Sequence, residues 1–167
     1  HRDIKPHNLI LSRDGRLLIT DFGLARVLEQ PGITMTSEVV GSPLYMAPEQ
    51  IRGDSVVDQR CDVYSLAATM FEWLTLEPPF SGKTRETVIT QILTGEMREP
   101  RSINPAIPPD VETICLKGLE REKHRRYASA GEFRDDLRAF LSAGRIRATR
   151  IGLVERTRRL VNRNRAG

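Results

Sequence analysis

The pattern of hydrophobic and polar positions divides the chain into a short β-like beginning, a long aperiodic segment and a helical remainder. Apolar residues fill two short runs, residues 9–11 and 17–20, and the Asp14-Gly15 step between them is typical of a β-hairpin turn. Residues 21–49 are rich in Gly, Pro, Ser and Thr and show little periodicity, so we expect a long loop there. A loop of this length inside a compact domain is usually functional or disordered.

The next part of the chain predicts three helices. Residues 62–76 are apolar on nearly every face, which indicates a helix buried in the core. Residues 83–94 carry an apolar stripe that Gly95 ends. A proline-rich connection, residues 98–109, then leads to a helix that starts at Pro109. The expected core positions are Val88, Ile89, Ile92 and Leu93 in the second helix and Val111, Ile114, Cys115 and Leu119 in the third.

A fourth helix is predicted over residues 130–141. Ser129 would cap its first turn, and Glu132 three residues later would complete a capping box. Its apolar stripe consists of Phe133, Leu137, Phe140 and Leu141, and Ala143-Gly144 would end the globular body. Because an isolated hairpin is marginal in water, we expect a mainly α fold with a small β-hairpin that lies on the helices.

Composition narrows the class of protein. The 167 residues, 39% hydrophobic and 29% charged, are typical of one soluble globular domain. Cys61 and Cys115 are the two cysteines, and no CxxC pair occurs, which argues against a disulfide framework or a zinc site and favours a reducing, cytoplasmic setting. No apolar run approaches the roughly 18–20 residues of a transmembrane helix.

The positive charge is concentrated at the C-terminal end. Residues 142–167 contain eight arginines against Glu155 alone, a net charge of +7, so the rest of the chain carries −3 out of a total of +4. We therefore treat residues 1–141 as the folded body and residues 142–167 as an Arg-rich tail. Such a tail could be attracted to anionic headgroups beside a membrane, or could equally be a solvated linker. Nucleic acid is not expected as a partner, since the tail has no aromatic residue to stack on bases.

The opening stretch, HRDIKPHN, concentrates residues that suit phosphate chemistry. Asp3, Lys5 and Asn8 lie within six residues, and Asp21 follows thirteen residues after Asn8. Amide and carboxylate oxygens are ligands for Mg²⁺, which also takes phosphate oxygens. A lysine can neutralise a transferring phosphoryl group, and a free carboxylate can accept the proton of a hydroxyl nucleophile.

These residues, followed by Asp21-Phe22-Gly23 and Ala47-Pro48-Glu49, resemble the protein-kinase signature set in content, order and spacing. The resemblance is to bacterial eukaryotic-like (Hanks-type) serine/threonine kinases, in the style of planctomycete multi-domain membrane kinases. It implies ATP and Mg²⁺ as cofactors and protein Ser/Thr side chains as substrates. Asp3 would be the catalytic base, Lys5 would steady the γ-phosphate, and Asn8 and Asp21 would hold magnesium.

Other roles follow from the same resemblance. Ile10 would lie under the adenine ring, or be a plain core residue of the strand, and the two interpretations are compatible. Lys5 two places after Asp3, together with Gly41-Ser42-Pro43, is typical of serine/threonine kinases, and Ser42 would bridge toward Asp3 and Lys5. Thr34 and Thr36 would be autophosphorylation sites in the activation loop, with Arg2 receiving the phosphate. Ordinary loop hydroxyls are the alternative for both threonines.

A further set of residues is expected to act as scaffold. His1 and Phe22 resemble members of an apolar column that ties the two lobes of a kinase together. Asp62 would anchor the backbone of the catalytic loop, and Glu49 would pair with Arg126. The chain departs from its relatives in Tyr64 and Ala67, where Trp and Gly are usual, and in Glu122-Lys123, where Asp-Pro is usual.

The resemblance covers the second half of a kinase domain. The sequence contains no G-x-G-x-x-G-x-V loop and no VAIK-type lysine. We therefore expect the C-terminal lobe of the protein-kinase fold, with the N-lobe absent, exposed apolar surface, and almost no activity of this chain alone. The alternative is a shortened, non-catalytic module that binds or scaffolds. A parent protein could be anchored to the inner membrane by a span beyond residue 167.

Overall fold

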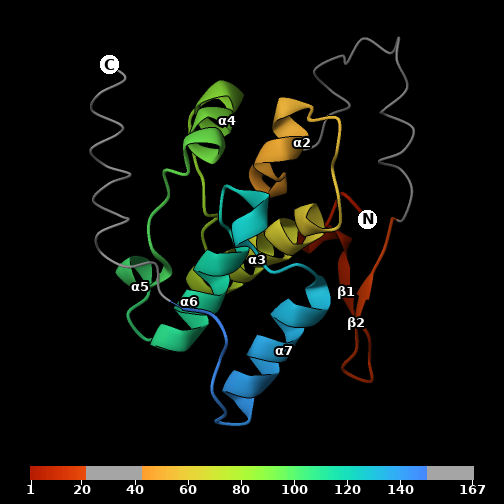
Figure 1. Ribbon diagram of the computed structural model, residues 1–167, viewed down its shortest axis with the longest axis vertical. Coiled ribbons are helices and arrows are strands. Elements are labelled where there is room, and N and C mark those ends of the chain that lie inside the picture. The colour runs from red at the N-terminus through yellow and green to blue at the C-terminus, as the bar shows by residue number, and fades with distance from the viewer. Residues whose placement is uncertain (22–42, 150–167) are drawn as a thin grey trace.

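The computed structural model describes residues 1–21 and 43–149. Their fold is mostly helical with one two-stranded antiparallel sheet, as predicted (Figure 1). Strand β1 (Leu9–Leu11) pairs with β2 (Leu17–Ile19), with Leu9 opposite Ile19. The turn is closed by a hydrogen bond from the Gly15 N–H to the Ser12 carbonyl at 3.0 Å, and Gly15 has a φ of 79°, which glycine adopts without strain.

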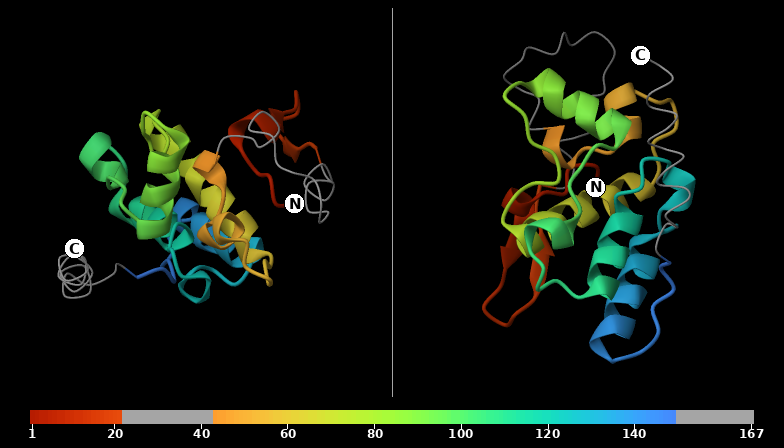
Figure 2. Two further views of the ribbon diagram at one scale, coloured as in Figure 1. Left: turned by 90° about the horizontal axis from the view of Figure 1, so that it is seen from above. Right: turned by 90° about the vertical axis from the view of Figure 1, so that its left-hand side faces the viewer.

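Helix α3 (Arg60–Thr75) forms the centre of the molecule and contacts α5 (Pro100–Ile103), α6 (Pro109–Gly118) and α7 (Ala130–Leu141) (Figures 1 and 2). The buried helix expected at residues 62–76 is therefore confirmed, although it starts two residues earlier. Leu76 is its left-handed C-cap with a φ of 61°. The burial is not complete, because Trp73 is 53% exposed.

A small residue allows α6 to approach α3 closely. A Cβ atom placed on Gly118 would lie 2.5 Å from the Cβ of Ala67. Any larger residue at position 118 would therefore push the two helices apart. Gly118 thus provides, from the opposite helix, the space that the Ala67 side chain needs.

The outer helices agree closely with the sequence pattern. Helix α4 (Arg85–Thr94) begins after Thr84, whose hydroxyl accepts the Thr87 N–H at 3.3 Å, and ends at Gly95 with a φ of 75°. Helix α7 has the predicted bounds, and the Ser129 hydroxyl accepts the Glu132 N–H at 3.2 Å. The Glu132 carboxylate accepts the N–H of Ala128 rather than that of Ser129, so the capping box closes one residue earlier than expected.

Some predictions for individual segments were wrong. The 3₁₀ turn η2 (Pro43–Tyr45) lies inside the segment expected to be loop, and helix α2 (Pro48–Arg52) begins inside it. Helix α5 interrupts the expected proline-rich connection. These elements are too short to show a hydrophobic period. Leu141, assigned to the buried stripe of α7, is 80% exposed because the helix ends there and turns it to solvent.

The packed body continues beyond Ala143-Gly144, where we expected it to end. Ile146 packs against the core and Ala148 is buried. The buried carboxylate of Asp136 in α7 accepts the N–H groups of Arg147 at 2.7 Å and Ala148 at 2.8 Å. Two polar backbone groups of the first tail residues are thereby bound to α7. Within the described residues, no helix is long and apolar enough to span a membrane.

Candidate active site

The loop before β1 brings Asp3, Lys5 and Asn8 together. The Lys5 ammonium lies 2.8 Å and 3.1 Å from the two carboxylate oxygens of Asp3. The Asn8 side-chain amide donates to the Asp3 carbonyl at 2.9 Å and to its carboxylate at 3.0 Å. Asp3 is half-buried whereas Asn8 is buried. The three residue types singled out by their spacing therefore form one cluster, with the carboxylate at its centre.

Local backbone geometry explains why these side chains converge. Pro6–Asn8 forms the 3₁₀ turn η1, in which the Asn8 N–H donates to the Lys5 carbonyl at 3.0 Å. This single turn brings the Asn8 side chain back toward Asp3. Pro6 suits the turn because its φ is already fixed near the required value and no backbone donor is lost at that position.

Asp21 is brought to the same edge by the hairpin. The Thr20 N–H donates to the Asn8 carbonyl at 2.9 Å, so the residue after Thr20 emerges beside Asn8. Asp21 is exposed and has a φ of 63°, which is unusual for a residue other than glycine. The amide nitrogen of Asn8 faces Asp3, so its amide oxygen is the end that can face a cation.

One amide oxygen and one carboxylate suit Mg²⁺ when phosphate and water supply its other ligands. In the described parts of the chain, no cluster of three or more His, Cys, Asp or Glu side chains could hold a metal by itself. The donor set at Asn8 and Asp21 therefore fits a cation that arrives with a phosphate ligand.

Asp62, near the start of α3, holds the loop backbone. Its Oδ1 accepts the Arg2 N–H at 2.7 Å, and its Oδ2 lies 3.0 Å from the main-chain nitrogen of His1. The His1 ring makes a further contact of 2.9 Å between Nε2 and the Thr20 carbonyl. Arg2 has a φ of 69° and is thus held in the left-handed region by these contacts. The predicted anchoring contact of Asp62 is present.

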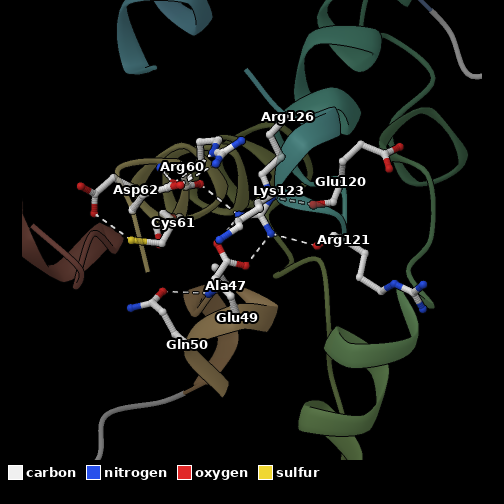
Figure 3. Close-up of polar contacts among 12 residues, drawn as sticks. Ala47, Glu49, Gln50, Arg60, Cys61, Asp62, Glu120, Arg121, Lys123 and Arg126 are labelled. Carbon is white, nitrogen blue, oxygen red and sulfur yellow. Dashed lines mark hydrogen bonds and ion pairs between the residues drawn. The ribbon is translucent and has the colours of Figure 1, made fainter. Parts of the chain in front are cut away.

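The predicted ion pair between Glu49 and Arg126 is also present, and it is buried (Figure 3). The two guanidinium NH2 groups lie 2.6 Å and 2.7 Å from the two carboxylate oxygens. Arg126 also donates to the carbonyls of Arg60, Glu120 and Arg121. Its guanidinium lies 4.9 Å from the ring centre of Tyr64. Glu122-Lys123 thus leaves the ion pair intact.

The remaining predicted residues divide into two groups. Ile10 lies in β1 opposite Leu18 and is 51% exposed, so it is not a buried strand residue. Phe22, Thr34, Thr36 and Ser42 lie outside the described residues.

Sequence reasoning missed polar side chains that bind distant backbone groups, and two of them bind near the ends of the described fold. Gln50 in α2 donates to the Arg2 carbonyl at 3.0 Å, and Asp136 binds the start of the tail. Their partners are backbone groups, which carry no residue-type signal. The one available hint was that Gln50 directly follows Ala47-Pro48-Glu49.

Comparison with known proteins agrees with this geometry. A family model described as the protein kinase domain matches residues 1–136. The chain belongs to the protein kinase family. The matched residues include the clustered Asp3, Lys5 and Asn8, as well as both members of the Glu49–Arg126 pair.

Three curated relatives of this chain illustrate the similarity, and all three are bacterial proteins. The chain is 40% identical over 151 residues to a probable serine/threonine-protein kinase of Streptomyces coelicolor, covering 89% of this chain and 22% of the relative. It is 36% identical over 155 residues to the serine/threonine-protein kinase PrkC of Bacillus subtilis, covering 93% and 24%. It is 40% identical over 142 residues to a protein of Myxococcus xanthus named tyrosine-protein kinase MasK, covering 85% and 22%. The chain thus spans less than a quarter of the length of these relatives.

Proposed function

We propose that this chain is the C-terminal lobe of a bacterial serine/threonine protein kinase, which transfers the γ-phosphate of ATP to protein hydroxyl groups when both lobes are present. The observation that carries the proposal is the Asp3 carboxylate held between Lys5 and Asn8. A carboxylate with its orientation fixed by two donors can receive a hydroxyl proton without first having to be ordered.

Each residue has a distinct part in the proposed transfer. Asp3 orients the substrate hydroxyl and accepts its proton as the oxygen attacks phosphorus and the bond from phosphorus to the departing ADP oxygen breaks. Lys5 stabilises negative charge on the phosphoryl oxygens. Asn8 and Asp21 would hold Mg²⁺, which neutralises phosphate charge when bound.

Preference for serine and threonine rests on less direct support. Lys5 stands two residues after Asp3, and the Streptomyces and Bacillus relatives are named serine/threonine kinases. The Myxococcus relative is named a tyrosine kinase, so substrate type needs a test of its own. Phosphoamino-acid analysis of labelled substrate should give phosphoserine or phosphothreonine, and phosphotyrosine alone would overturn this part of the proposal.

The chain alone is expected to be inactive, because its sequence contains neither a glycine-rich phosphate loop nor a VAIK-type lysine. A non-catalytic scaffold is the second candidate. The Asp3, Lys5 and Asn8 contacts favour the kinase, since a scaffold does not need a carboxylate clamped between two donors.

The test compares two polypeptides in an assay with labelled ATP, Mg²⁺ and a general protein substrate. One is the 167-residue chain, and the other adds an N-lobe that is encoded in frame upstream or taken from the Bacillus relative. We expect transfer by the longer polypeptide alone. Strong transfer by the short chain would refute our account of ATP binding, and inactivity of both would favour the scaffold.

Two further proposals concern the two threonines of the expected activation loop and the Arg-rich tail, whose residues 142–149 belong to the described structure. Thr34 and Thr36 are proposed as phosphorylation sites, and phosphopeptide mapping of the active two-lobe protein should find at least one of them modified.

The Arg-rich tail is proposed to bind anionic membrane surfaces. A peptide of residues 142–167 should bind anionic vesicles in a salt-sensitive manner, and absence of such binding would leave only the linker.

A further inference from the structure

Gln50 joins two parts of the molecule that are 48 residues apart in sequence. It is the third residue of α2, and its Oε1 accepts the N–H of Ala47, the N-cap residue, at 3.0 Å. Its Nε2 donates to the carbonyl of Arg2 at 3.0 Å. Ala47 has no side-chain oxygen to cap the helix, so Gln50 both completes the helix start and reaches the loop that carries Asp3.

The residue that Gln50 contacts has an unusual conformation. Arg2 directly precedes Asp3 and has a φ of 69°, a region that side chains other than glycine rarely adopt. Its N–H is bound to Asp62 of α3, and its carbonyl is bound to Gln50 of α2. The peptide groups on both sides of Arg2 are therefore fixed by two different helices. Loss of the second contact would leave the peptide group that connects Arg2 to Asp3 with one long hydrogen bond, 3.4 Å from the Asp3 N–H to the His1 Nδ1.

Helix α2 has only five residues, but its position relative to the core is fixed. Glu49, the neighbour of Gln50, forms the buried bidentate pair with Arg126. Movement of α2 would break that pair, so the position of the Gln50 amide is determined by the core of the molecule. The strain at Arg2 persists where its surroundings specify it from several sides.

We propose that Gln50 is a positioning residue for Asp3. Its amide holds the Arg2–Asp3 peptide group in the orientation that places the Asp3 carboxylate for proton acceptance. The inference rests on the proposed function, in which Asp3 is the catalytic base. It assigns to the residue that follows the Ala-Pro-Glu motif a direct contact with the catalytic loop.

The side-chain amide can be separated into its two halves by mutation. In Gln50→Glu, a carboxylate oxygen can still accept the Ala47 N–H, and negative charge in the first turn of a helix is favourable. The other carboxylate oxygen would face the Arg2 carbonyl with no hydrogen to donate. Gln50→Met keeps the length of the side chain without adding charge beside Glu49, and it removes both contacts.

A matched control exists in Gln59. Its Nε2 donates to the Ala128 carbonyl at 2.8 Å, which is also a long-range amide-to-backbone contact, and no contact with residues 1–8 is involved. Gln59→Glu therefore removes a bond of the same type away from the catalytic loop. An effect seen in both Gln50→Glu and Gln59→Glu would be due to the loss of any such amide contact, and would not be specific to Gln50.

The first readout is steady-state kinetics of the two-lobe polypeptide. We expect Gln50→Glu and Gln50→Met to lower kcat by roughly 10- to 100-fold, the scale of effect caused by a small misplacement of reacting groups. The KM for ATP should stay within about twofold, because the ATP contacts are made by other residues. Gln59→Glu should leave both constants close to wild type.

The second readout, hydrogen exchange in the absence of ATP, does not require phosphotransfer. Both Gln50 variants should exchange faster in the peptide covering residues 1–11, with other core peptides and the melting temperature little changed. Failure of the kinase proposal would appear as inactivity of the wild type with this exchange pattern intact. The positioning role would be refuted by wild-type exchange in residues 1–11, by an equal increase throughout the core, or by the same local effect in Gln59→Glu.

Discussion

At the scale of single residues, the charged groups of this molecule should differ widely in their contribution to stability, depending on how deeply they are buried. Arg126 and Glu49 are almost inaccessible to water, whereas Arg134 and Asp135 form a 2.7 Å pair on the surface of α7. A buried charge that loses its partner cannot be compensated by solvent, so the two pairs should respond very differently to mutation.

Glu49→Gln is predicted to lower the free energy of unfolding by about 3–5 kcal/mol, because Arg126 would remain buried without a counter-charge. Chemical denaturation of the purified chain measures this change. Asp135→Asn is the matched control and should leave the denaturation midpoint nearly unchanged. Equal effects of the two substitutions would contradict the importance assigned to burial.

Asp3→Asn is predicted to reduce kcat of the two-lobe polypeptide by roughly 10²- to 10⁴-fold, the contribution typical of general-base catalysis. Asparagine is similar in size and can still contact Lys5 and Asn8, so the circular dichroism spectrum should be unchanged. Asp135→Asn serves again as the control, with wild-type kcat. A fully active Asp3→Asn enzyme would exclude Asp3 as the base.

At the scale of elements, α7 acts through a carboxylate as well as through its apolar stripe. Asp136 accepts three hydrogen bonds, from the Tyr127 hydroxyl at 2.9 Å and from the N–H groups of Arg147 and Ala148. Burial, together with the hydrogen bond to Asp136, raises the pKa of Tyr127 well above its usual value. The hydroxyl therefore stays protonated and continues to donate.

Asp136→Asn is predicted to cost about 2–4 kcal/mol of stability, since hydrogen bonds to charged groups contribute about 1.5–3 kcal/mol each. The amide can accept through one oxygen only, so residues 145–148 should detach from α7. Limited proteolysis should then show faster cleavage after Arg145 and Arg147. Unchanged cleavage there, in a variant that is destabilised, would mean that Asp136 supports only Tyr127.

The elements that could be predicted from sequence are those with local signals. Helix α7 had Ser129 as a cap and a 3.6-residue stripe, and the hairpin had Asp14-Gly15. Helix α2 has neither a capping side chain at its N-cap nor an apolar stripe. It is held by the ion pair with Arg126, which lies 77 residues away in the chain. The Asp3, Lys5 and Asn8 cluster was visible in the spacing of its residues. The Gln50 contact was not, since its acceptor is a backbone carbonyl.

At the scale of the whole molecule, apolar surface remains exposed, as expected. Four exposed hairpin residues and two residues near the end of α3 make up most of it: Ile10, Leu11, Leu17, Leu18, Trp73 and Leu76. These side chains can be covered only by protein outside the described residues or by another molecule. The hairpin therefore adds little to the stability of the body that α3 organises.

Both thiols should report on unfolding of the whole molecule. Burial, with added repulsion from Asp62 and Glu49, raises the pKa of Cys61 to about 12, and burial also raises the pKa of Cys115. At pH 8 a disulfide reagent should modify neither thiol while the protein is folded, and both in denaturant. Rapid labelling under native conditions would contradict the packing of α3 against α6.

The same shift predicts a loss of stability in alkali. The folded state holds the Cys61 proton more tightly than the unfolded state, so its contribution is complete below about pH 9 and disappears as the pH rises toward 12. Denaturation midpoints measured from pH 8 to 11 should fall. The fall should be smaller in Cys61→Ala when each midpoint is compared with the value of the same protein at pH 8.

The separation of Glu49 from Arg126 has a consequence for biosynthesis. A ribosome adding about 5–20 residues per second needs roughly 4–15 s to make the 77 residues between them. Throughout that interval the nascent chain carries Glu49 without its counter-ion, and the support for Gln50 and the loop at Asp3 is incomplete. The loop at Asp3, although translated before Arg126, is thus among the later parts of the chain to reach its final geometry.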